Sequence, residues 1–456
     1  MAATSSVSGL VSGLDTSSII SQLMQLEAQP QTALKTTLTN TQSAITAYQG
    51  LNTKFQALLT AAQSLESANT WGARAATSSD PTVAASAAAG AVSGSITFTV
   101  NQLAAAHSLM TSASTGSLTD TSTFTTGGGS FQIVKGDGTT TTVTPNDGSL
   151  TTVVNAINSA SAGVRAAAVQ VAPGQYKLQV TSATTGDASS FTLQGLTGLG
   201  GTTVVQTGQN ASIHVGSATA GFDVTSATNT FIDVSPGLTF TVAKAETTAT
   251  VSVANDRDSI ATAVQAMVDA ANAVLSEITK QTATGTVNAN GTRTGQGALA
   301  GDTSVKAMTT SIISAVTSAL GGGVSAARYG IQSTRDGTLT FDKSAFQAAY
   351  NADPDGTRAA VAPTTGTGVA QRLATVADRA TDPVSGTITT TIASRNSTIQ
   401  SLNDQIAQWD VRLAQRQETL QNQFSAMEVA LQKLQSQASW LNGQISSLQA
   451  SQSASR

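Results

Sequence analysis

The chain has 456 residues, enough for about three domains of roughly 150 residues each, and carries a formal net charge of −4 with only 11% charged residues. Its Lys and Arg residues form no cluster, which argues against nucleic acid and anionic membrane surfaces as partners. It contains no Cys, which excludes disulfides, thiolate metal sites and cysteine nucleophiles.

No targeting or membrane-spanning segment is predicted. A membrane span would need about 18 consecutive apolar residues, and the sequence has no such run. Residues 1–13 hold no charged side chain and therefore lack the positive start of a secretory signal. If the protein leaves the cell, we expect export without a cleaved signal peptide.

The first predicted elements are two amphipathic helices within residues 1–69. Asp15 or Thr16 is placed to cap a helix that begins near Ser17. Pro30 cannot donate to a helix ladder, so this first helix stops or kinks there. A second helix follows, with an apolar stripe at helical spacing. The stripe consists of Leu34, Leu38, Ile45, Tyr48, Phe55 and Leu59.

The middle of the chain holds most of the 39 glycines, and Gly weakens a helix interior by up to about 1 kcal/mol relative to Ala. Residues 95–101 (SITFTVN) alternate apolar and polar side chains, as a half-buried strand does. Further short strands follow, separated by Gly- and Asp-rich turns, with one helix at 149–159. This pattern predicts a β-rich region over 107–249, made of one or two small domains.

Helical spacing returns after the β-rich region. Ile260–Ile278 and Val305–Leu320 are predicted amphipathic helices, and short strand and helix segments follow them. We therefore predict a mixed helix and strand domain built from residues 70–106 with 250–387. The β-rich region, 107–249, is inserted in this domain.

The last predicted element is a long helix within residues 388–456. Apolar residues recur in it at every seventh position. A second apolar residue follows each of them, three residues later in the first part of the helix and four residues later in the second part, and Arg416 marks the change. A straight α-helix drifts by about 20° per heptad, so the pattern fits a long, nearly straight helix as well as a supercoiled pair. The seven-residue row consists of Ile399, Ile406, Leu413, Leu420, Met427, Leu434, Leu441 and Leu448.

The two ends are predicted to form one terminal helical region, 1–69 with 388–456, whose helices need tertiary packing to be ordered. Two unrelated amphipathic helices on a globular core are the alternative. An apolar stripe needs a cover, from the other terminus or from other copies of the chain, so both stripes are predicted self-assembly and filament-contact sites. The fold class is thus multidomain α+β, with long coiled-coil-like terminal helices, a mixed domain and the β-rich insertion.

The sequence contains no motif that indicates catalysis, a cofactor or a metal. GxSxG and HExxH are absent, and residues 195–201 (GLTGLGG) are not followed by a helix. The run Asp353–Gly356 lacks the closing Glu of a calcium loop, which favours an exposed turn or helix terminus. His107 and His214 have no clustered carboxylates near them in sequence. We therefore predict a protein that is not an enzyme and holds no cofactor.

Several segments are similar to characteristic blocks of one known family. These are residues 9–30 (GLVSGLDTSSIISQLMQLEAQP), 94–108 (GSITFTVNQLAAAHS) and 330–342 (GIQSTRDGTLTFD), together with the closing helix over 405–448. They resemble the flagellar filament cap proteins, the flagellar hook-associated protein 2 family, and the likeness spans nearly the whole chain. The chain departs from this family at Ala271, where an aromatic residue is common, which affects local packing.

The resemblance implies a mechanical role outside the cell, at the tip of the flagellar filament. Such proteins form a homo-oligomeric ring, a pentamer or hexamer, that retains exported flagellin and promotes its folding and insertion. In this family the β-rich region forms the distal plate and the mixed domain forms the leg. Hook–filament junction proteins are further expected partners, and export follows the flagellar type III route. An export chaperone is expected on the apolar stripe between Leu420 and Leu448.

Three other functions stay open from the sequence. The first is another axial protein of the flagellum, such as a hook–filament junction protein, although the GLDTSS opening argues against it. The second is an extracellular adhesin that binds host glycans through residues 107–249. The third is an enzyme, whose activity would depend on His107 or His214.

Overall fold

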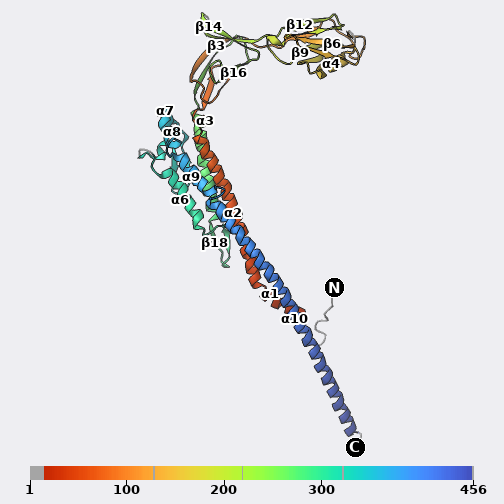
Figure 1. Ribbon diagram of the computed structural model, residues 1–456, viewed down its shortest axis with the longest axis vertical. Helices are drawn as coiled ribbons and strands as arrows, with labels where there is room; N and C mark the ends of the chain where they lie inside the picture. The colour runs from red at the N-terminus through yellow and green to blue at the C-terminus, as the bar shows by residue number, and fades with distance from the viewer. Residues whose placement is uncertain (1–14, 127–128, 218, 321–322, 454–456) are drawn as a thin grey trace. The chain divides into compact units, whose positions relative to one another are not determined.

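The computed structural model describes residues 15–126, 129–217, 219–320 and 323–453, and the side chains of 448–453 lie outside this description. The chain divides into two compact units. A helical unit comprises the residues up to 66 and from 263 onward, and a β unit comprises residues 67–262. Figure 1 shows the helices of the first unit and the strands of the second. The predicted multidomain α+β architecture is confirmed.

The helical unit contains long helices at both chain ends, several shorter helices and two small hairpins. The helices are α1 (Thr16–Glu27), α2 (Gln29–Glu66), most of α5 (Arg257–Gln281), α6 (Thr303–Thr317), α7 (Lys343–Ala352), α8 (Pro354–Val361), α9 (Val369–Thr381) and α10 (Thr387–Ser453), with the short 3-10 turn η4 (Ala326–Tyr329). The hairpins are β18 (Thr284–Val287) with β19 (Arg293–Gln296), and β20 (Ile331–Ser333) with β21 (Leu339–Phe341).

Aspartates begin several of these helices by capping free backbone N–H groups. The Asp15 carboxylate accepts a hydrogen bond from the Ser18 N–H at 3.0 Å, so the predicted cap of the first helix is confirmed. Asp342 caps α7 through the Ser344 N–H at 2.9 Å. Asp353 caps α8 through the Gly356 N–H at 2.9 Å, which makes it the helix terminus that the sequence favoured.

Pro30 lies in the first turn of α2, and the break between α1 and α2 falls at Ala28, two residues earlier than expected. A proline is tolerated in the first turn because the N–H groups there have no partner within the helix. The predicted break is therefore present, but it comes before the proline. Pro30 belongs to the first turn of α2 and does not end α1.

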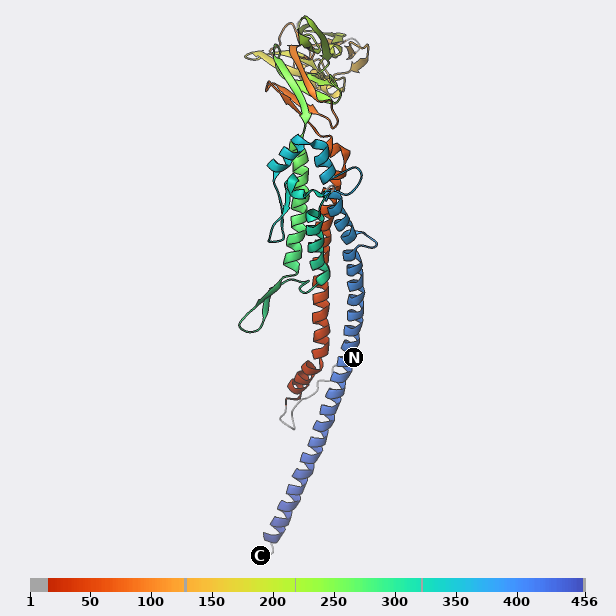
Figure 2. The same cartoon turned by 90° about the vertical axis from the view of Figure 1, so that its left-hand side faces the viewer.

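The core of the helical unit forms where α2 packs against α9 and α10 (Figure 2). Leu51, Phe55, Leu58 and Leu65 of α2 are completely buried. The facing side of α9 is rich in alanine, so the two helices approach closely. It consists of Val369, Ala370, Leu373, Ala374, Ala377 and Ala380, all buried. The sequence analysis did not predict α9, although its apolar and charged residues lie on opposite sides of the helix.

The first core of the β unit is a sandwich of two antiparallel sheets. One has the order β1-β17-β3-β13-β14 and the other β15-β16-β2. Phe98 of the first sheet stacks on Phe240 of the second, with ring centroids 4.5 Å apart. The strands are β1 (Arg74–Ser78), β2 (Val83–Ala87), β3 (Gly94–Gln102), β13 (Ala211–Ser217), β14 (Ala220–Ser226), β15 (Thr230–Ile232), β16 (Leu238–Val242) and β17 (Thr248–Asn255), and the short helix α3 (Ala68–Trp71) precedes them.

This sandwich places the boundary between the units elsewhere than the sequence predicted. The strands of 70–106 were grouped with the helices after residue 250, yet they belong to the β unit. The cause is backbone hydrogen bonding, because β3 pairs with β17 on one side and with β13 on the other. Because β3 lies between β17 and β13 in one sheet, it belongs to the same unit as the strands of the predicted insertion.

The second core of the β unit lies within residues 108–206 and combines α4 (Leu150–Ser159) with three antiparallel sheets. The sheets have the orders β12-β4-β9-β8, β10-β6-β7 and β11-β5. Phe131, Ile133, Leu150, Val153 and Ile157 are buried among them. The strands are β4 (Ser108–Thr111), β5 (Thr125–Thr126), β6 (Phe131–Lys135), β7 (Thr140–Val143), β8 (Val164–Ala172), β9 (Gln175–Ser182), β10 (Phe191–Gln194), β11 (Leu196–Thr197) and β12 (Thr202–Gln206), with a 3-10 turn, η2 (Asp187–Ser189), after β9.

Candidate self-assembly and filament-contact site

The terminal helices carry the two predicted stripes, and the structure brings part of each stripe together within the helical unit. α2 packs against α10, and α1 packs against a later stretch of α10. The two termini therefore cover each other over part of their length, as one of the predicted arrangements required. Further along α10, every side chain from residue 432 to residue 447 is exposed.

The stripe of α2 is largely used inside the helical unit. Phe55 is completely buried, and Tyr48 and Ile45 are 3% and 8% exposed. Leu34, Leu38 and Leu59 are half-buried. Because these side chains already pack within one copy of the chain, their role in filament contact stays a prediction.

The seven-residue row of α10 passes from covered to uncovered along the helix. Ile399, Ile406 and Leu413 are half-buried, and Leu420 is only 6% exposed. Met427 is half-buried, and from residue 432 to residue 447 every side chain is exposed. Leu448 lies in α10, but its side chain is outside the described part of the chain.

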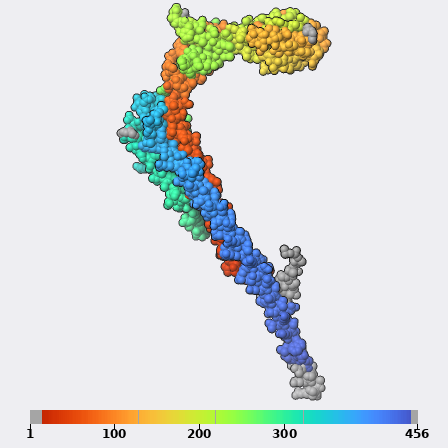
Figure 3. All heavy atoms as spheres, viewed as in Figure 1, coloured from red at the N-terminus to blue at the C-terminus, as the bar shows by residue number. Residues whose placement is uncertain are grey.

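The uncovered end of α10 presents a distal stripe, defined here as Leu434, Leu441 and Ile445. Their exposed fractions are 61%, 55% and 48%. Positions seven and four residues apart lie on one side of a helix, so the three side chains form a continuous apolar strip. Figure 3 shows this part of α10, in blue, extending beyond α1. Exposed apolar strips of this kind mark interaction surfaces.

Polar contacts hold the covered part of α10 in place. The buried Gln31 of α2 donates from Nε2 to Asp410 Oδ1 at 2.6 Å and to the Ile406 carbonyl at 3.4 Å. Arg416 Nε lies 3.2 Å from Glu27 Oε1 of α1. The arginine that interrupts the apolar row is thus explained, because it pairs with a carboxylate where α1 packs on α10.

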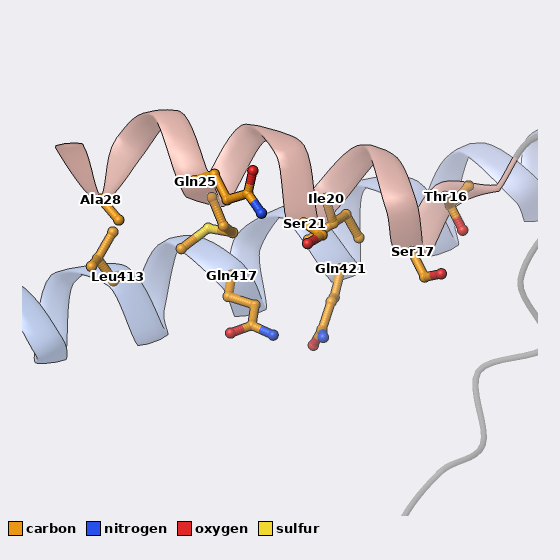
Figure 4. A pocket seen from close by; sticks show the side chains of 10 residues that line it. Thr16, Ser17, Ile20, Ser21, Gln25, Ala28, Leu413, Gln417 and Gln421 are labelled. Atoms are coloured by element: carbon orange, nitrogen blue, oxygen red, sulfur yellow. The ribbon is translucent and has the colours of Figure 1, made fainter.

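A groove of about 500 Å³ runs between α1 and α10 (Figure 4). Ile20, Met24 and Leu413 supply apolar surface, while Gln417 and Gln421 supply polar surface. The groove is open along its length and contains no charged side chain. It resembles a helix–helix seam that is incompletely filled, and no cluster of polar groups converges in it.

A polar cluster joins α2, α6 and α10 within the helical unit. The Tyr48 hydroxyl donates to the Asp302 carboxylate, and the Arg395 guanidinium lies 3.9 Å from the same carboxylate. The guanidinium carbon also lies 5.3 Å from the Tyr48 ring centroid. Asp302 in addition caps α6, accepting from the N–H groups of Ser304 and Val305. Burial, followed by the hydrogen bond to Asp302 and its charge, raises the pKa of Tyr48 to about 12.

This raised pKa predicts a loss of stability at alkaline pH. In the unfolded chain a tyrosine ionises near pKa 10, so between about pH 10 and pH 12 the unfolded state releases a proton that the folded state keeps. The free energy of unfolding therefore falls, and the protein becomes less stable, as pH rises through this window. The variant Tyr48→Phe should be less stable than the parent at about pH 8, and the difference should shrink by about pH 11.5. Urea unfolding at both pH values measures this, with Tyr176→Phe in the β unit as control. A constant difference would contradict the assignment.

The structure brings no catalytic group together in the described part of the chain. His107 is buried, with its ring edge on Phe191, whereas His214 is partly exposed in the β13–β14 hairpin. His214 Nδ1 lies 2.7 Å from Asp223 Oδ1, and this hydrogen bond raises the pKa of His214. Among the residues described, no three His, Asp or Glu side chains lie close enough to share a metal ion. Nor does any helix described here have the length and apolar character to cross a membrane.

Comparison with known proteins places these features in a family. The family model for the C-terminus of flagellar hook-associated protein 2 matches residues 208–436, just over half of the chain. The model for the N-terminus of the same family matches residues 12–107. The two matches span most of the terminal helices, the sandwich and the helical unit.

Individual relatives agree over the whole length. Flagellar hook-associated protein 2 of Escherichia coli K12 is 28% identical, over 97% of this chain and 98% of the relative. The B-type flagellar hook-associated protein 2 of Pseudomonas aeruginosa is 29% identical, over 93% of this chain and 95% of the relative. The crystal structure of domains D1, D2 and D3 of the flagellar cap protein FliD from Escherichia coli superposes with a TM-score of 0.57 at 25% identity, covering 77% of this chain and 99% of that one.

Proposed function

The chain belongs to the flagellar hook-associated protein 2 family, and we propose that it caps the growing tip of a bacterial flagellar filament. The observation that carries this function is the family match, which extends over both termini and which the relatives share along their full length. The family resemblance inferred from sequence motifs is confirmed. In this role the protein is a structural element outside the cell, and we propose no catalytic activity for it.

We propose that the cap is a homo-oligomeric ring of five or six copies that retains exported flagellin and promotes its insertion. A ring uses the same two surfaces on every copy, so each copy needs surfaces that are stable when exposed and able to pair. The low charge of the chain, 11% of residues, supports this, since contacts between weakly charged surfaces depend little on salt. Flagellin and the hook–filament junction proteins are the partners that this role requires.

We propose that the distal stripe of α10 is the part of the terminal region that contacts neighbours. Its apolar side chains are exposed in one copy, whereas those of the α2 stripe are buried or half-buried. Burial of an exposed leucine stabilises an interface by about 1.5–3 kcal/mol, so a few such residues suffice to hold a helix among others. The predicted positions Leu434 and Leu441 are therefore the strongest candidates, and the buried Ile45, Tyr48 and Phe55 the weakest.

Before assembly the distal stripe favours aggregation, because an exposed apolar surface associates non-specifically. We propose that an export chaperone covers α10 between Leu420 and Leu448 until the chain leaves the cell by the type III route without a cleaved signal peptide. The covered Leu420 and the uncovered Leu434 mark where the contacts within one copy end and those with a partner begin.

Two of the three alternative functions inferred from sequence, another axial protein and an adhesin, are not favoured. Every match reported above names a cap or hook-associated protein 2, and none names a junction protein or an adhesin. Binding of host glycans by the β unit would be an addition to the cap role and not a replacement for it.

Localisation on intact flagella tests the proposed function. In the bacterium that encodes the chain, an antibody to residues 107–249 should label filament tips in electron micrographs. Deleting the gene should release flagellin monomers into the medium and shorten the filaments, and expression of the full chain should restore them. Label along the filament or at its base would indicate another axial protein. Label confined to the cell body would favour the adhesin.

A further inference from the structure

The four-stranded sheet of the second β core has two open edges. In the described part of the chain β12 pairs only with β4, and β8 pairs only with β9. Open edges usually carry a charged residue or a proline that discourages pairing with another chain. β12 (TTVVQ) carries neither, and in β8 the only charged side chain is that of Arg165, near its beginning.

Exposed apolar side chains gather on these two edges. Among the described residues 108–206, the exposed large hydrophobic residues are Val171, Val204 and Val205, at 47%, 56% and 55%. Val171 lies on β8, and the other two lie on β12. The sheet therefore exposes apolar surface where its backbone is also unpaired, which is the combination that favours strand addition.

The backbone groups that point outward can be assigned from the hydrogen bonds on the inner side of each edge. The Gly201 carbonyl accepts from the Ser112 N–H, so alternate residues of β12 face β4, and Thr202 and Val204 point outward. On β8 the Gly163 carbonyl faces β9, so the even-numbered residues point outward.

One of the outward positions on β8 is already closed. The side-chain amide of Asn158 bonds both the N–H and the C=O of Ala166, at 2.9 Å each. These two hydrogen bonds satisfy the outward backbone groups of Ala166, in the first half of β8. Ala168 and Gln170 are left as the outward backbone positions of the second half, beside the exposed Val171.

We propose that β12 of one copy pairs with β8 of the next, so that the sheet continues from copy to copy. Successive strands in the order β12-β4-β9-β8 are antiparallel, so β12 and β8 run in opposite directions. A second copy in the same orientation therefore offers β8 antiparallel to β12. Val204 then lies opposite Ala168 of the second copy, Thr203 opposite Val169, and Thr202 opposite Gln170.

The pairing uses two different edges, so each copy has one of each, and the contact repeats around a ring instead of ending at a dimer. The inference deepens the proposed function, because it names the contact that closes the ring, and it rests on that function. The occupant is a second copy of this chain because the two edges run in opposite directions and neither carries a charged side chain in the stretch that would pair, 202–204 with 168–170.

Engineered cysteines test the register without background, since the chain has none of its own. Thr203 and Val169 are predicted to form a non-hydrogen-bonded pair with Cα atoms about 4.5 Å apart, which suits a disulfide. The full-length double variant Thr203→Cys/Val169→Cys, oxidised gently after purification, should give a ladder of dimers, trimers and larger species on a non-reducing gel. The control Thr203→Cys/Ala168→Cys places the second thiol on the opposite face and should give none.

Three results would overturn the edge pairing. The first is the absence of a ladder from the matched pair, and the second is the same ladder from the control. The third is a dimer from the single variant Thr203→Cys, which would indicate two-fold pairing of β12 with β12. Loss of the ladder while the antibody still labels filament tips would refute the edge pairing and leave the cap function intact.

A charge on the edge supplies a second test that does not depend on disulfide chemistry. Val204→Lys should abolish self-association measured by light scattering, because the lysine would stand at the paired edge. Thr192→Lys puts the same charge at an exposed position of β10, an edge strand of the three-stranded sheet, and should leave self-association unchanged. Both variants should melt at the temperature of the parent. Self-association of Val204→Lys equal to that of the parent would contradict the proposal.

Discussion

The double variant Leu434→Glu/Leu441→Glu is expected to fold as stably as the parent chain and to lose cap function completely. In one copy both side chains are more than half exposed, so the substitutions remove no packing within the helical unit. Exposed substitutions of this kind usually change the free energy of unfolding by less than about 0.5 kcal/mol. At an interface, however, two carboxylates would lose their water within an apolar strip, a cost of several kcal/mol.

Swimming motility, tip labelling and thermal melting measure this result together. The matched control is Ser439→Glu/Ser446→Glu, which adds the same charge five residues further along α10, on the other side of the helix. The control should swim normally. Normal swimming of the leucine variant would show that the distal stripe is not buried in the assembled cap. A lowered melting temperature would show that it packs within one copy.

Asp302→Ala is expected to destabilise the helical unit by about 2–4 kcal/mol, the largest effect on stability that we predict for an exchange of one polar side chain. The loss of a helix cap costs about 1 kcal/mol, and a buried hydroxyl without a partner costs about 1–3 kcal/mol more. Asp302 supplies both functions, since it caps α6 and accepts from Tyr48, and it also faces Arg395. The contributions share one carboxylate, so they need not add fully.

Two comparison variants separate these contributions in urea unfolding experiments. Asp342→Ala removes a cap of the same geometry from α7, where the carboxylate accepts from Ser344 and Ala345, and should cost about 1 kcal/mol. Asp302→Asn keeps an acceptor for the cap and for Tyr48 but loses the charge, and should fall between Asp302→Ala and the parent. Equal losses for Asp302→Ala and Asp342→Ala would mean that the contact with Tyr48 contributes nothing.

Strong periodicity made the long helices and many of the strands predictable. The seven-residue row over 399–448 predicted α10, and the spacing of Ile260–Ile278 predicted α5, because a repeated apolar position constrains a helix wherever it packs. Helix α9 was not predicted, although its apolar and charged residues lie on opposite sides of the helix. Its buried face is mostly alanine, whose small side chain lets α9 approach α2.

The candidate site was predictable as a set of stripes but not as a surface. Tyr48 and Leu441 occupy equivalent positions in the sequence pattern, yet Tyr48 is 3% exposed and Leu441 is 55% exposed. Arg416 interrupts the apolar pattern in the sequence, and only the structure shows that it pairs with Glu27 of α1. Which member of a stripe is covered depends on where α1 ends and how far α2 extends along α10, and both are matters of packing between segments distant in the sequence.

By itself, the sequence determined the family, the helical termini, the β-rich middle and the absence of thiol chemistry, because motifs, periodicity and composition are local properties. Only the tertiary structure decided that residues 70–106 join the inserted strands, that the α2 stripe is largely internal, and that β12 and β8 are the open edges of one sheet. These depend on backbone hydrogen bonds and side-chain contacts between residues far apart in the chain, and no local pattern encodes which distant strand or helix will supply the partner.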